Sequence, residues 1–163
     1  MKRLFIDLDK CDRCPDACPV KCSYYYHPFN DGVCRLRELA GYLVVCRRCE
    51  VGSCVQACPV EALERGQDGV LRRYSMRCVS CKSCSLACPF GTILPELLPF
   101  TVSTCDFCVD RCQDKDPLCV RTCPYGAIQF CEIEPNEEKA FYGIGEHLVI
   151  RSTLHWERNE AKK

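Results

Sequence analysis

Residues 78–93 read CVSCKSCSLACPFGTI, and this cysteine-rich run decides the fold. Cys78, Cys81 and Cys84 follow one another at the spacing C-x2-C-x2-C, which lets three sulfurs converge on three irons of one cubane cluster. Cys88 follows one helical turn later and precedes a proline, and in bacterial runs of this type the fourth cysteine binds a different cluster. The run therefore predicts ligands for [4Fe–4S] clusters.

Three further cysteine groups make the chain a fourfold repeat. Their spacings are C-x2-C-x3-C-x3-C, then C-x2-C-x4-C-x3-C, then C-x2-C and C-x3-C separated by ten residues. The first group is Cys11, Cys14, Cys18 and Cys22, the second is Cys46, Cys49, Cys54 and Cys58, and the fourth is Cys105, Cys108, Cys119 and Cys123. Of the 19 cysteines, this leaves Cys34, Cys112 and Cys131 unassigned.

Disulfide frameworks and zinc sites also produce cysteine-rich sequences. Acidic residues interrupt the apolar stretch within residues 1–9, which argues against a secretion signal, and no apolar run approaches the length of a membrane span. We therefore expect a cytoplasmic location, where thiols stay reduced and dense cysteine indicates metal. Zinc sites use isolated C-x2-C pairs, often with histidine, whereas these cysteines come in threes plus one and the chain has 3 histidines.

Composition excludes one class of partner and predicts a dependence on metal. The chain has 22 basic and 22 acidic residues, which gives no sign of nucleic-acid binding. Its hydrophobic fraction of 47% includes the 19 cysteines, so the remaining apolar side chains form a modest core. We expect metal ligation to supply folding energy and the apoprotein to be largely unfolded.

The segments between the cysteine groups favour short elements. Runs that favour strands precede the groups at 4–6, 42–45, 70–74 and 100–102. The Cys-Pro segments that follow the last three groups predict a helical turn and then a strand. Gly66, Gln67, Asp68 and Gly69 predict the turn of a hairpin.

The first group is irregular and leaves two assignments open. The favoured ligands are Cys11, Cys14, Cys18 and Cys22. The alternative takes Cys18-Pro19 as the Cys-Pro end, which puts Leu8 where a first ligand belongs and requires Cys22 or Cys34 to complete the set.

From Cys11 to Ile128 the chain resembles a known family, most specifically in the 78–93 run and in the stretch CDFC…PLCVRTCPYGAI. It is similar to the four-cluster, ferredoxin-like subunits that serve dimethyl-sulfoxide reductase, formate dehydrogenase, formate hydrogenlyase, carbon monoxide dehydrogenase and tungsten aldehyde oxidoreductases. The resemblance implies an α+β fold of two bacterial-type 2[4Fe–4S] ferredoxin-like units, one inserted within the other. The departures are the irregular first group and the lack of the C-terminal membrane helix that some relatives carry.

The resemblance also implies a crosswise ligation of four [4Fe–4S] clusters. The ligand sets would be Cys11, Cys14, Cys18 with Cys123; Cys46, Cys49, Cys54 with Cys88; Cys78, Cys81, Cys84 with Cys58; and Cys105, Cys108, Cys119 with Cys22. We expect a four-cluster domain over 1–131, with an outer unit at about 1–41 plus 99–131 and an inner unit at about 42–98.

The tail over 132–163 changes in composition. An acidic linker over 132–139 precedes the apolar residues 148–150 and the single Trp156. A strand this short is not stable alone, so it either covers the chain's own sheet or docks on a partner. Because tryptophan favours interfaces, we expect docking.

Several remaining residues carry a functional and a plainer interpretation. The three unassigned cysteines are spare ligands or redox thiols, or more commonly small buried hydrophobes. The aromatic stretch 23–29, with His27, lines a cluster or a partner face, or simply packs beside the core. Basic residues near the cysteine groups raise cluster potentials, face an acidic partner, or are solvated: Arg47, Arg48, Arg72, Arg73, Lys82 and Arg111.

Closed four-cysteine coordination predicts a non-catalytic subunit that relays single electrons, because substrate chemistry needs an open metal position. The expected partners are a catalytic oxidoreductase subunit (a molybdenum or tungsten enzyme or a hydrogenase) and a ferredoxin, a flavin subunit or another copy of the chain. The alternatives are a free-standing polyferredoxin, or an enzyme with an open iron at the first group.

Overall fold

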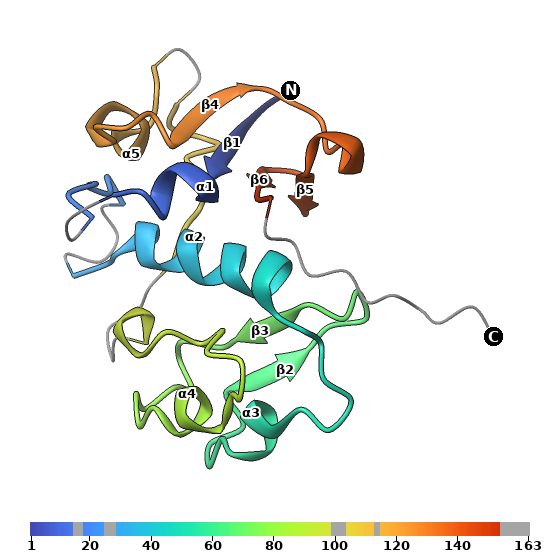
Figure 1. Cartoon of the computed structure of the whole chain (residues 1–163). Coiled ribbons are helices and arrows are strands. Elements are labelled where there is room, and N and C mark those ends of the chain that lie inside the picture. Colours follow the sequence, from blue (N-terminus) through green and yellow to red (C-terminus); the bar gives the residue numbers. More distant parts are fainter. Residues whose placement is uncertain (15–17, 25–28, 99–103, 113–114, 154–163) are drawn as a thin grey trace.

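The computed structural model describes the chain except for residues 15–17, 25–28, 99–103, 113–114 and 154–163 (Figure 1). A four-stranded sheet has the order β4-β1-β6-β5, and a two-stranded hairpin pairs β2 with β3. The strands are β1 (Lys2–Asp7), β2 (Leu63–Arg65), β3 (Leu71–Arg73), β4 (Ile128–Glu132), β5 (Phe141–Ile144) and β6 (Leu148–Arg151). Short helices and strands together confirm the α+β class.

The helices are short and fall between the strands. They are α1 (Leu8–Cys11), α2 (Gly32–Ala40), the π-helix η1 (Gly41–Val45), α3 (Ser53–Gln56), α4 (Ser83–Ala87), the 3₁₀ turn η2 (Pro95–Leu97), α5 (Leu118–Thr122) and the 3₁₀ turn η3 (Glu137–Lys139). In Figure 1, α2 lies between the four-stranded sheet and the β2–β3 hairpin. The cysteine-bearing α3 and α4 lie on the far side of that hairpin from α2.

Helix α2 is an element that the sequence analysis did not predict. The Asp31 carboxylate begins it, because one oxygen accepts hydrogen bonds from the backbone N–H groups of Val33 and Cys34, each at 3.1 Å. Val33, Leu36 and Ala40 are buried at the spacing of one helix face. This apolar spacing was available in the sequence as a signal.

Strand β1 occupies an interior position of the four-stranded sheet and confirms the strand expected at 4–6. It pairs antiparallel with β4 and parallel with β6. Leu4 and Ile6 lie opposite Leu148 and Ile150, and all four side chains are buried. The sheet therefore joins the two ends of the described chain in one core.

The docking role expected for residues 148–150 is wrong. These residues form most of β6, which lies between β1 and β5 of the chain's own sheet, and all three are fully buried. The physical reason is that β1 has a second edge opposite β4, and three consecutive apolar residues suit a strand covered on both faces. Trp156 lies outside the described residues.

Some of the remaining strand predictions are confirmed and others are wrong. The hairpin expected around Gly66–Gly69 is confirmed, with Leu63 opposite Arg73. The strand expected at 42–45 is wrong, because the chain continues from α2 directly into η1 and buries Tyr42, Leu43 and Val44 as a helix. After the third group the chain forms η2, not the expected strand. The strand expected at 100–102 lies outside the described residues.

Leu148→Ala should lower the free energy of unfolding by about 2–5 kcal/mol, because it leaves a cavity in the sheet's core. Anaerobic denaturant unfolding of the metal-loaded protein measures this. Leu86→Ala is the matched control: Leu86 is 88% exposed, so we expect a change below about 0.5 kcal/mol. Equal losses in the two variants would contradict the burial of β6.

Candidate iron–sulfur sites

The loops between the cysteines hold an unusual backbone conformation. Arg48, Ser80, Lys82, Phe107 and Cys108 have φ between 50° and 63°. Such a conformation costs a residue with a side chain roughly 1–2 kcal/mol. Alternating right- and left-handed residues turn successive backbone N–H groups toward one point, the arrangement that surrounds many anionic iron–sulfur sites.

Three short helices place the last two cysteines of their groups. In groups two to four, the third cysteine lies within α3, α4 or α5, and the fourth follows the end of that helix. Cys88 and Cys123 directly follow the last residue of α4 and α5. The fourth cysteine thus leaves the group in a new direction.

We name the four crosswise cysteine sets I to IV. Set I is Cys11, Cys14, Cys18 and Cys123; set II is Cys46, Cys49, Cys54 and Cys88; set III is Cys58, Cys78, Cys81 and Cys84; set IV is Cys22, Cys105, Cys108 and Cys119.

Set I combines the first group with the end of the fourth. Burial, followed by charge on Cys123, Cys14 and Cys18, raises the pKa of Cys11 to about 12. Charge on these three thiols contributes because they lie near Cys11. All four thiols line one cavity of about 540 Å³.

Thiols of the second and third groups, which make up sets II and III, also lie near one another. Burial, followed by charge on Cys46 and Cys88, raises the pKa of Cys54. Burial also raises the pKa of Cys84 to about 11, and charge on Cys78 and Cys58 contributes. The four cysteines of set II line a small cavity of about 30 Å³.

Set IV brings Cys22 to the fourth group. Burial and charge on Cys119, Cys22 and Cys108 raise the pKa of Cys105 to about 12. Gly32, the first residue of α2, permits this approach: a Cβ there would lie 2.8 Å from the Cys22 sulfur. Each set therefore contains thiols from two distant cysteine groups.

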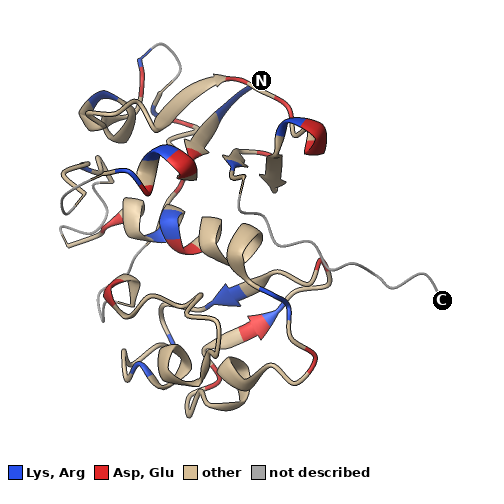
Figure 2. Cartoon of the chain, in the orientation of Figure 1, with Lys and Arg blue, Asp and Glu red and all other residues tan. Residues whose placement is uncertain are grey.

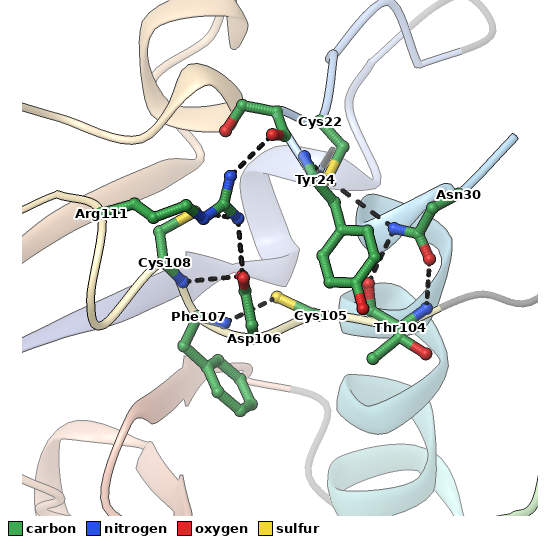
Figure 3. Close-up of polar contacts among 10 residues, drawn as sticks. Cys22, Tyr24, Asn30, Thr104, Cys105, Asp106, Phe107, Cys108 and Arg111 are labelled. Carbon is green, nitrogen blue, oxygen red and sulfur yellow. Dashed lines mark hydrogen bonds and ion pairs between the residues drawn. The ribbon is translucent and has the colours of Figure 1, made fainter. Parts of the chain in front are cut away.

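Figure 3 shows how polar contacts hold the segment after Cys22 against the fourth group. The Asn30 side chain donates to the Thr104 carbonyl and accepts from the Thr104 N–H, each at 2.8 Å. Arg111 donates to the Ser23 carbonyl at 2.6 Å and to both oxygens of Asp106 at 2.7 and 2.9 Å. These bonds fix the relative position of two segments that are about 80 residues apart.

Backbone N–H groups donate to several of these sulfurs. Ala62 donates to Cys58 at 3.2 Å, and Phe107 donates to Cys105 at 3.4 Å. Hydrogen bonds to sulfur are one of the means by which a protein sets the reduction potential of a cluster.

The three unassigned cysteines occupy different environments. Cys34 lines the same cavity as set I, and its thiol donates to the Asp31 carboxylate at 2.9 Å. Cys112 lines a separate cavity with Phe107 and His147. Burial raises the pKa of Cys131, which lies in β4. His27 lies outside the described residues.

The donor sets fit cubane clusters. Among the described residues, no group of three or more His, Cys, Asp and Glu side chains is placed to hold a single metal ion. In a cubane each cysteine binds a different iron, so the sulfurs lie farther apart than around one zinc ion. Thiols drawn from two segments, several of which accept hydrogen bonds from backbone N–H groups, suit the larger group.

Residues 42–133 match the family model described as "4Fe-4S dicluster domain". This match covers more than half of the chain. The chain belongs to this family.

Curated relatives extend along most of the chain. The Escherichia coli K12 protein YsaA, whose name proposes electron transport, is 33% identical over 82% of this chain and 92% of its own length. The B subunit of the anaerobic dimethyl sulfoxide reductase of Escherichia coli K12 is 28% identical over 83% of this chain and 75% of its own length. The thiosulfate reductase electron transfer subunit PhsB of Salmonella typhi is 31% identical over 61% of this chain and 53% of its own length.

These similarities confirm the resemblance seen in the sequence. The chain is a ferredoxin-like iron–sulfur electron-transfer subunit. Two of these relatives are named as a chain and as an electron transfer subunit of a reductase. Within the described part of the chain, none of the helices has the length and apolar character to cross a membrane.

Asn30→Ala should weaken set IV, because it removes two hydrogen bonds to Thr104. We expect a loss of about 1–3 kcal/mol in the free energy of unfolding and faster loss of iron to a chelator. Asn136→Ala is the control, since Asn136 caps the exposed turn η3 and contacts none of the four sets. Iron loss at the same rate in both variants would contradict the role of Asn30.

Proposed function

We propose that the chain holds four [4Fe–4S] clusters in series and relays single electrons through them. The observation that supports this proposal is that thiols of distant cysteine groups lie near one another: Cys123 near Cys11, Cys88 near Cys54, Cys58 near Cys84 and Cys22 near Cys105. A bound cubane with four thiolates supplies one-electron redox chemistry. The protein's own contribution is to hold the thiols and to exclude competing ligands.

Sets I to IV are the proposed ligand sets, and they follow from two nested units. The outer unit is about 1–41 plus 99–131 and the inner unit about 42–98. The pairing of β1 with β4 supports the outer unit, because it joins the two ends of that unit. The β2–β3 hairpin, which lies wholly within the inner unit, supports the second.

The proposed partner is a catalytic oxidoreductase subunit, either a molybdenum or tungsten enzyme or a hydrogenase. The names of relatives that belong to dimethyl sulfoxide and thiosulfate reductases support it. A chain of clusters has two ends, so a second partner is required: a ferredoxin, a flavin subunit or another copy of the chain. We place this exchange in the cytoplasm.

A second candidate function rests on set I. The cavity at set I, of about 540 Å³, is much larger than the cavity at set II. Cys34 lines the cavity at set I as a fifth thiol. If the irregular first group leaves one iron without a cysteine, that iron is open to a substrate. The chain would then be an enzyme at this cluster.

Iron and acid-labile sulfide analysis of anaerobically purified protein, with EPR during stepwise reduction, tests both functions. The relay predicts about sixteen of each per chain and interacting S = 1/2 signals. A three-iron signal would contradict a closed set I and support the enzyme, whereas about twelve of each would mean that one cluster is missing altogether.

Paired cysteine variants test the crosswise ligation. Cys11→Ala and Cys123→Ala should perturb the same EPR signal. Cys119→Ala and Cys22→Ala, made separately, should both perturb a second signal. Cys131→Ala is the control and should retain all signals and the full iron content. If Cys123→Ala instead matches Cys119→Ala, each group binds its own cluster and the nested arrangement is wrong.

A further inference from the structure

Four charged and polar side chains form a network between α2, η1 and β3, and three of them are buried. The Glu38 carboxylate accepts hydrogen bonds from Nε and Nη2 of Arg73, the latter at 3.2 Å. It also accepts from the Tyr42 hydroxyl at 2.9 Å and from Arg35 at 2.7 Å. Glu38, Arg73 and Tyr42 are 3%, 2% and 1% exposed. A network this deep is costly unless each charge is paired.

One donor of Arg73 is left over by this pairing. Its Nη1 atom is buried and has no hydrogen-bond partner among the residues that the structure describes. Burial opposes the charge of Arg73, but Glu38 and then Cys78 outweigh it and raise the pKa of Arg73. The chain also turns back directly after Arg73, since the backbone N–H of Cys78 donates to the carbonyl of the next residue, Tyr74, at 3.1 Å. The leftover N–H groups therefore lie near a cysteine of set III.

The network carries a net positive charge next to set III. Two guanidinium groups, those of Arg73 and Arg35, share the single carboxylate of Glu38. Figure 2 shows the basic part of β3 facing the mixed basic and acidic part of α2. Of the six basic residues that the sequence placed near cysteine groups, all within the described chain, Arg73 alone is buried.

A buried positive charge favours the reduced form of a nearby cluster. An oxidised cubane with four thiolates carries about −2, and reduction adds one more negative charge. Attraction to a cation grows with that charge, and screening by water and salt is weak inside the protein. A guanidinium beside a ligand of set III thus raises the reduction potential of the cluster bound there.

We propose that Arg73, held by Glu38 and Tyr42, is a positioning residue that raises the reduction potential of the set III cluster. The unpartnered Nη1 would donate to the sulfur of Cys78 when iron is bound. This proposal rests on the relay function. It adds that Glu38 of α2, in the outer unit, helps to set the potential of a cluster in the inner unit.

Arg72 provides a matched control on the same strand. Its side chain is 43% exposed and pairs with Asp68 at 2.7 Å, whereas that of Arg73 is 1% exposed. Successive residues of a strand point to opposite faces. Replacing either arginine removes one positive charge, but only Arg73 is buried beside set III.

Redox titration followed by EPR on the loaded protein measures the effect, with Cys81→Ala identifying the set III signal. Arg73→Gln should make reduction of that cluster about tenfold less favourable, or about 59 mV for one electron. Arg72→Gln should change it less than about threefold, and Arg73→Lys should recover only part of the loss, because lysine keeps the charge but not the bidentate geometry toward Glu38. The Arg73→Gln shift should persist in about 1 M salt, where exposed charges are screened within about 3 Å.

Glu38→Gln supplies a readout of opposite sign. Removing the carboxylate leaves both guanidinium groups unneutralised, so the same cluster should become easier to reduce, by about threefold or more. A merely structural role would shift both variants in one direction. If Arg73→Gln does not fold, Glu38→Gln alone tests the proposal. The proposal is then overturned if the reduction potential of the set III cluster does not rise in Glu38→Gln.

Iron content and reduction potentials distinguish a failure of this inference from a failure of the proposed relay. Iron content below about sixteen in the unmodified protein counts against the four-cluster relay itself. Full iron content, with equal potentials for Arg73→Gln and Arg72→Gln, overturns only the role of Arg73.

Discussion

The antiparallel pairing of β1 with β4 is the constraint on which the rest of the structure depends. It places residues 2–6 alongside residues 128–132, although more than 120 residues separate them in the chain. Because Cys11 follows β1 and Cys123 precedes β4, this one ladder brings the first cysteine group to the end of the fourth. The residues between these two strands must then leave the sheet and return to it, and the second and third cysteine groups lie within this stretch.

Strand β6 and helix α2 stabilise this arrangement from two directions. β6 covers the free edge of β1 and buries three apolar side chains completely. α2 packs its apolar face into the same core and reaches the hairpin through Glu38 and Arg73. A buried ion pair contributes little net stability but is strongly destabilising to break, so it favours one relative position of the segments it joins.

The cysteine loops make the opposite contribution to stability. Five residues with side chains adopt the left-handed conformation there, and the thiols raise one another's pKa values. The left-handed conformation opposes folding in the absence of metal, and the raised pKa values oppose loss of the thiol protons. Both are offset when an anionic cluster accepts hydrogen bonds from the N–H groups and binds the thiolates. Such local conflict between conformation and sequence is typical of functional sites.

By itself the sequence determined the chemistry, because ligand spacing is a local property. The 78–93 run and its three repeats identify cubane ligands, and the glycines around residues 66–69 identify the hairpin. Only the tertiary structure decided which distant segments meet: that residues 148–150 pair with β1, that residues 42–45 continue a helix, and that Arg73 alone among its basic neighbours is buried. These outcomes depend on edges and faces supplied by distant parts of the chain. The sequence of a strand-forming run does not show whether a partner or the chain's own sheet covers it. Nor does the sequence around a basic residue show whether its side chain faces water or a buried carboxylate.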